Sequence, residues 1–281
     1  MTGTPDYLAV LPNHLGEPLS PSNAIVNGGV LTGQNTAQRM FVKRYAVDMD
    51  AQRKAEAEGL RMLAEKTSFV VPRILYENVG IMVIPWLDGS GSEEAWSPAE
   101  FGHCLGQMHE ITGEAYGYGH TTFCGPTPQD NSHHLNWEAF FWEQRLEPLL
   151  RRIEFSSFGE MDWRRRVEAV RDVMKAEIED AVTGPRLVHG DLWQGNVLKL
   201  GPGTGLIDPA LYFGHPEVDL GMLTLFGSPA PSFWDGYTKV RPLRSGFFRR
   251  ASFYNLFHIM NHCVLFGGGY WEQLDREIRS F

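Results

Sequence analysis

The stretch from Leu187 to Pro209, which reads LVHGDLWQGNVLKLGPGTGLIDP, most constrains what this chain can fold into. An apolar lead-in brings Asp191 to a turn, and Asn196 follows five residues later, just before a second apolar pair. A Gly-Pro-Gly-Thr-Gly turn at 201–205 then returns the chain to Asp208. We therefore predict a hairpin that has an aspartate and an asparagine at its start and a second aspartate at its end.

These residue types fit the transfer of a phosphoryl group, which travels with magnesium and needs hard oxygen ligands. Asn196 and Asp208 supply such oxygens, while Asp191 is placed to accept the proton of an attacking hydroxyl. The pattern H-G-D-L-W-Q-G-N has the spacing of the kinase loop H-R-D-x-x-x-x-N, and His189, which opens it, joins Asp191 as a candidate catalytic residue. Asp, Gly, Asn and Pro also gather in ordinary turns, but the complete constellation favours a kinase site.

The segment 189–196 resembles the aminoglycoside phosphotransferases. Trp193 within it, the run LIDPALYFGHPEVDLGML at 206–223 and the run YNLFHIMNHCVLFGGGY at 254–270 are similar to the fructosamine (ketosamine) kinase family. The chain differs from protein kinases, because Asp208 is followed by proline and alanine where they have D-F-G.

The resemblance implies an α+β, bilobal, protein-kinase-like fold of the aminoglycoside phosphotransferase type. Residues 1–86 would form a small nucleotide-binding lobe with an antiparallel sheet, and residues 87–281 a mainly helical lobe for catalysis and acceptor binding. The implied reaction uses ATP and Mg²⁺ to phosphorylate a sugar hydroxyl of a ketosamine at its third carbon. The acceptor would be a small molecule or a protein-bound ketosamine.

Two apolar runs, 25–31 and 39–45, predict a hairpin in the small lobe. In that register the loop 20–24 covers the nucleotide phosphates, with Ser22 and Asn23 as the contacting residues. A competing register makes 27–29 the phosphate loop but leaves little chain for the strand that must follow.

Lys43 resembles the small-lobe lysine that holds the α- and β-phosphates, although an edge-strand lysine facing solvent would fit the same pattern. The predicted helix 51–65 offers an acidic partner, either Glu56 or Glu58. The resemblance selects Glu56, which also shares a helical face with Leu60.

Pro85, Trp86 and Leu87 form a stiff segment that we take as the hinge whose backbone meets the adenine edge. An ordinary linker between domains would have a similar sequence.

In the large lobe, the resemblance assigns Asp219 to support of the catalytic loop. Trp193 lies two residues after the presumed base, and its indole face can cover the apolar side of a sugar ring; a core anchor under the loop is the alternative. Apolar spacing predicts core helices at 136–152, 163–181 and 247–265, and Ser97 caps another.

The composition limits the partners. A net charge of −9 argues against a nucleic-acid surface, which needs clustered lysine and arginine. No apolar run is as long as a membrane-spanning helix and the N-terminus lacks the features of a signal peptide, so we expect no membrane contact and a cytoplasmic location. Three widely spaced cysteines fit buried thiols in a reducing compartment.

Two other functions stay open from the residues alone. A kinase for an aminoglycoside, a choline-like compound or another small hydroxyl substrate would share the catalytic hairpin. A pseudokinase that binds nucleotide without turnover would also fit the predicted phosphate loop 20–24, which lacks the usual glycines, but the intact set of Asp191, Asn196 and Asp208 argues against it.

Overall fold

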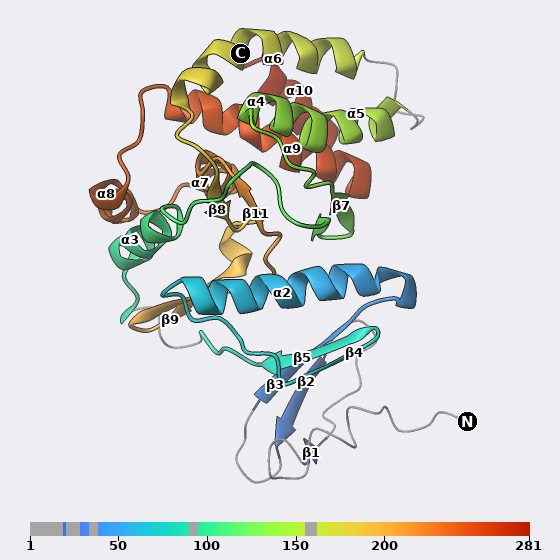
Figure 1. Ribbon diagram of the computed structural model, residues 1–281, viewed down its shortest axis with the longest axis vertical. Helices are drawn as coiled ribbons and strands as arrows, with labels where there is room; N and C mark the ends of the chain where they lie inside the picture. The colour runs from blue at the N-terminus through green and yellow to red at the C-terminus, as the bar shows by residue number, and fades with distance from the viewer. Residues whose placement is uncertain (1–18, 21–28, 34–38, 90–94, 155–161) are drawn as a thin grey trace. The chain divides into compact units, whose positions relative to one another are not determined.

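The computed structural model describes residues 19–20, 29–33, 39–89, 95–154 and 162–281 (Figure 1). The chain forms two compact units. The first comprises the chain up to Trp96 together with Val197–Asp208, and the second comprises Ser97–Asn196 and Pro209–Phe281. The catalytic stretch is thus shared between the units, whereas we had placed all of it after a single boundary at Trp86. The nucleotide and acceptor roles of the two lobes stay predictions.

The first unit contains an antiparallel sheet of five strands in the order β1-β2-β3-β5-β4. The strands are β1 (Leu19–Ser20), β2 (Gly29–Gly33), β3 (Arg39–Arg44), β4 (Tyr76–Asn78) and β5 (Ile81–Pro85). In β3, Met40 and Val42 are buried against Val83 on one face. Because strand side chains alternate between faces, Phe41 and Lys43 point to the opposite face.

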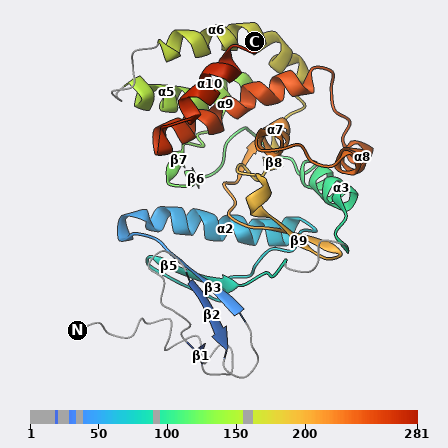
Figure 2. The ribbon, with the colours of Figure 1, turned by 180° about the vertical axis from the view of Figure 1, so that it is seen from behind.

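Helix α2 (Asp50–Lys66) follows a short 3₁₀ turn, η1 (Val47–Met49), and covers that opposite face of the sheet (Figures 1 and 2). Its residues Ala57 and Leu60 pack with Met82 and Ile84 of β5. The helix ends at Thr67, whose backbone N–H and side-chain hydroxyl both donate to the Leu63 carbonyl. The predicted helix at 51–65 is confirmed with both ends within one residue.

A hairpin of β9 (Val197–Leu200) and β10 (Gly203–Leu206) completes the first unit. It is bound there through Val70, whose N–H donates to the Thr204 carbonyl at 2.9 Å and whose carbonyl accepts from Leu206. The predicted turn at 201–205 is wrong in length, because strand pairing begins at Gly203. A side chain on Gly205 would press on Leu200 and Leu198, so small residues are needed inside the strand itself.

The second unit begins with helix α3 (Pro98–Met108), which Ser97 caps by accepting from the Glu100 N–H at 3.2 Å, as predicted. Helix α8 (Pro231–Val240) lies beside it in both views (Figures 1 and 2). The two backbones touch at glycines: a Cβ on Gly102 would lie 2.1 Å from the Phe233 carbonyl oxygen, and one on Gly236 would lie 1.9 Å from that of Ala99. We call this contact the glycine seam.

The main core of the second unit is built from five helices of the described residues, which bury apolar side chains against one another. They are α4 (Trp137–Phe141), α5 (Glu147–Glu154), α6 (Trp163–Ala181), α9 (Phe247–Phe266) and α10 (Tyr270–Ile278). The predicted helices are confirmed, except that a π-helical turn, η3 (Trp142–Leu146), joins α4 to α5. Helix α9 runs through the middle of this group and carries thirteen buried side chains, from Phe247 to Cys263.

The remaining elements of the second unit are short. Two strand pairs occur, β6 (Thr122–Cys124) with β7 (Thr127–Gln129), and β8 (Arg186–Val188) with β11 (Tyr212–Gly214). The turn η4 (Gln194–Asn196) ends the catalytic loop, and helix α7 (Glu217–Leu225) follows β11. Among the described residues, no helix combines the length and apolar character needed to cross a membrane.

Candidate active site

The catalytic loop leaves strand β8 and turns at His189 and Gly190. Gly190 has a φ of 80°, and a Cβ there would lie 2.2 Å from the carbonyl oxygen of Ala210. The His189 carbonyl accepts from the Ala210 N–H at 2.8 Å, which locks the turn against the strand that returns. Only glycine fits this backbone and this close approach.

Asp219, at the start of α7, is completely buried beneath the loop. Its carboxylate accepts from the N–H groups of His189 at 2.7 Å and of Gly190 at 2.9 Å. Its third partner is His109 Nε2 at 3.2 Å, and His109 Nδ1 lies 2.8 Å from the hydroxyl of Tyr237. Burial alone raises the pKa of Asp219, but the hydrogen bonds and charge of His109 and the loop outweigh it, so the carboxylate stays ionised.

His189 is buried at the base of this turn, and its Nδ1 lies 3.4 Å from the Asp191 backbone N–H. Its side chain therefore holds the loop and is shielded from any bound molecule. We propose a positioning role for His189 in place of direct contact with substrate.

Asp191 and Asn196, predicted as base and metal ligand, lie together at the end of the loop. The Asn196 amide nitrogen donates to the Asp191 carbonyl at 2.9 Å and lies 3.5 Å from its carboxylate Oδ2. Because the nitrogen is turned to Asp191, the amide oxygen of Asn196 is left as a potential ligand atom.

The structure adds two neighbours of Asp191 that the sequence analysis missed. The Nδ1 of His258, from α9, lies 3.9 Å from Asp191 Oδ1, and Cys124 Sγ belongs to the same cluster, whose ligand atoms all lie within 4.8 Å of one another. Asn261 holds this arrangement, since it accepts from Thr127 and contacts Cys124. Helical spacing places 258 and 261 on one face of α9, which is the signal that could have found them.

The two groups beside Asp191 carry no charge at neutral pH. Burial raises the pKa of the Cys124 thiol far above its ordinary value, so it stays protonated. Burial also lowers the pKa of His258 to about 3, which keeps the imidazole neutral beside Asp191. We interpret both residues as uncharged neighbours of the Asp191 carboxylate.

Trp193 is exposed to 41% and is not a core anchor beneath the loop. Its indole lies over Gly195, where an added Cβ would come within 2.3 Å of the ring. It meets Phe226 edge-on at 6.3 Å between centroids, and Phe226 in turn meets His262 at 5.9 Å. The row continues to Tyr270, whose ring lies 4.8 Å from that of His262. We call these four rings the aromatic row.

In the first unit, the predicted pair of Lys43 and Glu56 is present as an ion pair. Lys43 Nζ also donates to Asp208 Oδ1 at 2.6 Å, and Tyr45 donates to the second oxygen of Glu56 at 2.7 Å. Burial alone lowers the pKa of Lys43, but the charges of Glu56 and Asp208 outweigh it and the net shift is upward. Glu58, the alternative partner, is exposed.

Asp208 has a φ of 56°, the one positive value at a non-glycine position in the described part of the chain. Such a conformation costs of order 1 kcal/mol or more and clusters at functional sites. Its side chain is 46% exposed, so one carboxylate oxygen binds Lys43 while the group remains accessible.

The predicted hinge follows β5. The Trp86 N–H donates to the Arg39 carbonyl at 2.9 Å, so it belongs to the sheet and is not available to an adenine. The indole of Trp86 is exposed, and the guanidinium of Arg39 lies 4.6 Å from its centroid. Pro85 and Leu87, on either side, are half-buried. Ser22 and Asn23, predicted to cover the phosphates, lie outside the described residues, as do 27 and 28 of the competing register.

Comparison with known proteins decides the family. Residues 10–281 match the model of the family described as fructosamine kinase. The chain belongs to the fructosamine kinase family. The family resemblance predicted from the catalytic stretch is therefore confirmed over almost the whole sequence.

The sequence is also similar to individual kinases over most of their length. The chain is 36% identical over 249 residues to the probable ketoamine kinase of Vibrio parahaemolyticus, covering 86% of this chain and 85% of that protein. It is 32% identical over 245 residues to the chloroplastic protein-ribulosamine 3-kinase of Arabidopsis thaliana, covering 84% of this chain and 74% of that protein.

Solved structures confirm the predicted fold of this fructosamine kinase relative. A proposed fructosamine-3-kinase from Thermobifida fusca superposes with a TM-score of 0.86 at 30% identity, covering 99% of both chains. The streptomycin–ATP complex of the aminoglycoside phosphotransferase APH(2")-IIa superposes at 0.65 with 15% identity, covering 100% of this chain and 98% of that one, and shares the fold. The protein is thus a phosphotransferase that acts on hydroxyl groups, as predicted.

Proposed function

We propose that this protein uses ATP and magnesium to phosphorylate a sugar hydroxyl of a ketosamine. The observation that carries the proposal is the contact of Lys43 with both Glu56 and Asp208. Asp208 comes from a segment far from the other two in sequence, and the three side chains present the cation and carboxylates that kinases use on the nucleotide side. The names of the relatives, a ketoamine kinase and a protein-ribulosamine 3-kinase, support the acceptor.

Asp191 is the proposed base. The acceptor hydroxyl oxygen forms a bond to the γ-phosphorus while the bond to the bridging oxygen breaks and ADP leaves, and the hydroxyl proton passes to Asp191. Asp219 keeps the loop in place through the two backbone N–H groups that it binds. Cys124 and His258 lie beside the Asp191 carboxylate, and both are neutral at pH 7.

Asn196 and Asp208 are the proposed magnesium ligands. Both side chains fit this role, since the Asn196 amide nitrogen is committed to Asp191 and the exposed Asp208 carboxylate uses one oxygen for Lys43. When bound, magnesium would offset the negative charge of the phosphates. Lys43 would contact the α- and β-phosphates, and the hinge at Pro85, Trp86 and Leu87 the adenine.

Trp193 is proposed to carry the sugar of the acceptor. It is exposed, it follows the base by two residues, and it opens the aromatic row, which suits the apolar face of a sugar ring. The acceptor is a free ketosamine or one formed on a protein side chain, and the acidic chain is not suited to nucleic acid.

The test is ADP release by the purified protein with a panel of acceptors. We expect turnover with fructose- and ribulose-derived amines, and at least tenfold less with an aminoglycoside, choline or the free sugars. Asp191→Asn supplies the background rate. Phosphorus NMR of the product should place the new ester on the third carbon of the sugar. Turnover of an aminoglycoside or choline in preference to every ketosamine would refute the acceptor assignment.

A further inference from the structure

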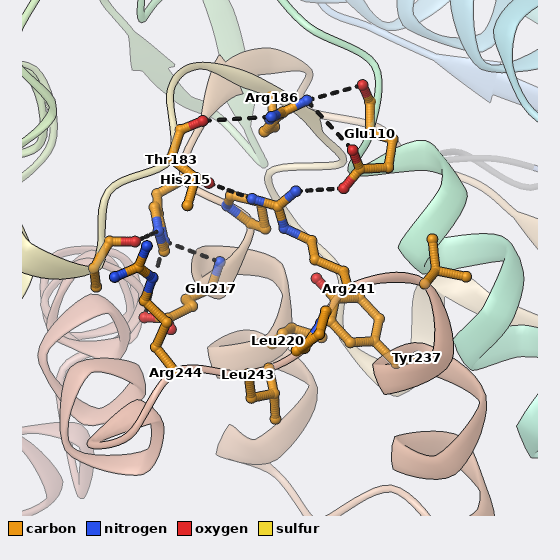
Figure 3. Close-up of a pocket in the computed structure, with 14 residues that line it drawn as sticks. Glu110, Thr183, Arg186, His215, Glu217, Leu220, Tyr237, Arg241, Leu243 and Arg244 are labelled. Atoms are coloured by element: carbon orange, nitrogen blue, oxygen red, sulfur yellow. Dashed lines mark hydrogen bonds and ion pairs between the residues drawn. The ribbon is translucent and has the colours of Figure 1, made fainter.

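A second cavity lies in the second unit, on residues to which the proposed reaction assigns no role. It has a volume of about 390 Å³ and opens among the ends of α3, α6 and α8 and the start of α7 (Figure 3). Its polar wall carries Arg186, Arg241 and Arg244, and the Tyr237 ring closes one side.

The charge of this cavity is positive in a chain whose net charge is −9. Glu110 is shared by two of the arginines, Arg186 and Arg241. The other acidic group of the wall, Glu217, is already bound by Arg250 through two hydrogen bonds of 2.8 and 2.7 Å. The wall therefore holds three guanidinium groups, two of which share Glu110, its one carboxylate not taken by an arginine from outside the wall.

The other titratable group of the wall adds no charge at neutral pH. Burial lowers the pKa of His215 to about 3, and the imidazole lies between the Ala181 carbonyl and the Glu217 N–H. The positive potential thus comes from arginine alone and persists at every physiological pH.

The cavity wall also has unused donors. Two of the guanidinium groups cap the end of α6 or the turn after α3: Arg244 donates to the Asp180 carbonyl at 3.0 Å, and Arg186 to the carbonyls of Glu110 and Thr183. Arg241 donates to the side chains of Glu110 and Thr183. Arg244 makes just the one side-chain bond to the described part of the chain, which leaves Nε and Nη2 for a ligand.

We infer that this cavity binds the phosphate group of a small phosphorylated molecule. Convergent guanidinium groups with free N–H donors match the oxygens of a phosphate in shape and charge. The volume falls within the range of small-ligand sites and leaves room for a group of sugar size beside the phosphate. The ring of Tyr237, together with Leu220 and Leu243, offers an apolar surface for that group (Figure 3).

The site is joined to the catalytic loop by hydrogen bonds. Tyr237 contacts His109, His109 contacts Asp219, and Asp219 holds the loop at His189 and Gly190. A molecule bound in the cavity would therefore contact Tyr237, and the series of hydrogen bonds that starts at Tyr237 ends at the loop that carries the proposed base.

The experiment is calorimetric titration at low chloride with three probes: inorganic phosphate, glucose 6-phosphate and glucose. The test variants are Arg244→Gln and Arg241→Gln. Lys43→Met controls for phosphate binding at the nucleotide site, and Arg249→Gln removes an exposed arginine outside the cavity. We expect wild type and both controls to bind one or both phosphorylated probes and not glucose, and each test variant to lose about tenfold or more in affinity.

Binding of inorganic phosphate without glucose 6-phosphate would identify the free anion as the ligand, and the reverse would identify the ester; both support the site. Arg244→Gln removes one hydrogen bond to the protein, so it should keep the melting temperature of the wild type and carries the test if Arg241→Gln is unstable. The inference is overturned if neither probe binds, if the test variants bind like wild type, or if Lys43→Met alone abolishes binding.

Discussion

Asp191 owes its proposed role to the groups immediately around it. The Asn196 amide fixes its backbone carbonyl, and the side chains of Cys124 and His258 approach its carboxylate without positive charge. Asp208 differs, since Lys43 binds it directly.

Substitutions of Asp191 and of Asp208 should therefore affect turnover and ATP binding differently. Asp191→Asn should lower turnover by about a hundred- to ten-thousandfold and leave the affinity for magnesium–ATP unchanged, because a proton acceptor is lost. Asp208→Ala should weaken magnesium–ATP binding as well as turnover. Calorimetric titration with ATP in magnesium separates the two, and the division of roles is wrong if the first variant loses ATP binding while the second retains it.

Lys43 and Glu56 are nearly buried, with side chains exposed to 16% and 10%. Removing one partner of a buried pair leaves the other charge without compensation, so we expect Lys43→Met and Glu56→Gln each to lower stability by about 3 kcal/mol. The double variant should be more stable than the sum of the single effects predicts, and all three should lose turnover. Urea unfolding and kinetics measure this.

Glu58→Gln is the matched control for that pair, because Glu58 lies on the exposed face of the same helix. It should keep both stability and turnover. An effect of Glu58→Gln equal to that of Glu56→Gln would contradict the assignment.

Trp193 and Trp86 form a second matched pair, since both indoles are exposed, to 41% and 37%. A stacking contact contributes about 1 to 2 kcal/mol, so Trp193→Ala should raise the Michaelis constant for the acceptor about ten- to thirtyfold and leave that for ATP alone. Trp86→Ala should do the reverse. Steady-state kinetics beside melting curves measures both, and a Trp193→Ala protein that loses stability and ATP binding together would indicate a structural role.

At the scale of elements, the glycine seam fixes α3 against α8. Gly236→Ala would place a methyl group inside the van der Waals radius of the Ala99 carbonyl oxygen, and the helices would have to separate. We expect a loss of about 3 kcal/mol or more in unfolding free energy, measured in urea. Gly119→Ala, at a position with no heavy atom within 4 Å of the added Cβ, should be close to neutral.

The elements also show what a sequence can predict. Apolar residues at helical spacing located α6 to the residue, and the composition of 51–65 located α2 to within one residue at each end. The π-helical turn and the short hairpin turn at Gly201 were not predicted, since both depend on what the residues meet across space. Motif spacing likewise identified Asp191, Asn196 and Asp208. Cys124 joins the site from a distant segment without a local pattern, and His258 has only its helical spacing from Asn261 as a signal.

At the scale of the whole molecule, buried histidines should make stability depend on pH. The pKa of His215 and of His258 is lowered to about 3 by burial, while in the unfolded chain it is about 6.5. Below pH 6.5 the unfolded state therefore binds a proton at each position and the folded state does not. Stability falls as the pH falls, by about 2 kcal/mol for each histidine between pH 7 and pH 5.

Urea unfolding at pH 7 and pH 5 measures this loss. His215→Gln removes one titrating group and should reduce the difference between the two pH values by about 2 kcal/mol, whatever it does to stability at pH 7. Equal unfolding free energies of the wild type at both pH values would show that the histidines are accessible to protons in the folded state.

Gly190 sets this catalytic loop apart from the H-R-D loop of protein kinases. Protein kinases place arginine at the corresponding position of H-R-D, whereas here the backbone is left-handed and the Ala210 carbonyl fills the space where a side chain would begin. An arginine in place of Gly190 would require the turn and the returning segment at Ala210 to move apart, and a left-handed backbone would have to carry a side chain. This catalytic loop therefore cannot accept the H-R-D sequence on its present backbone.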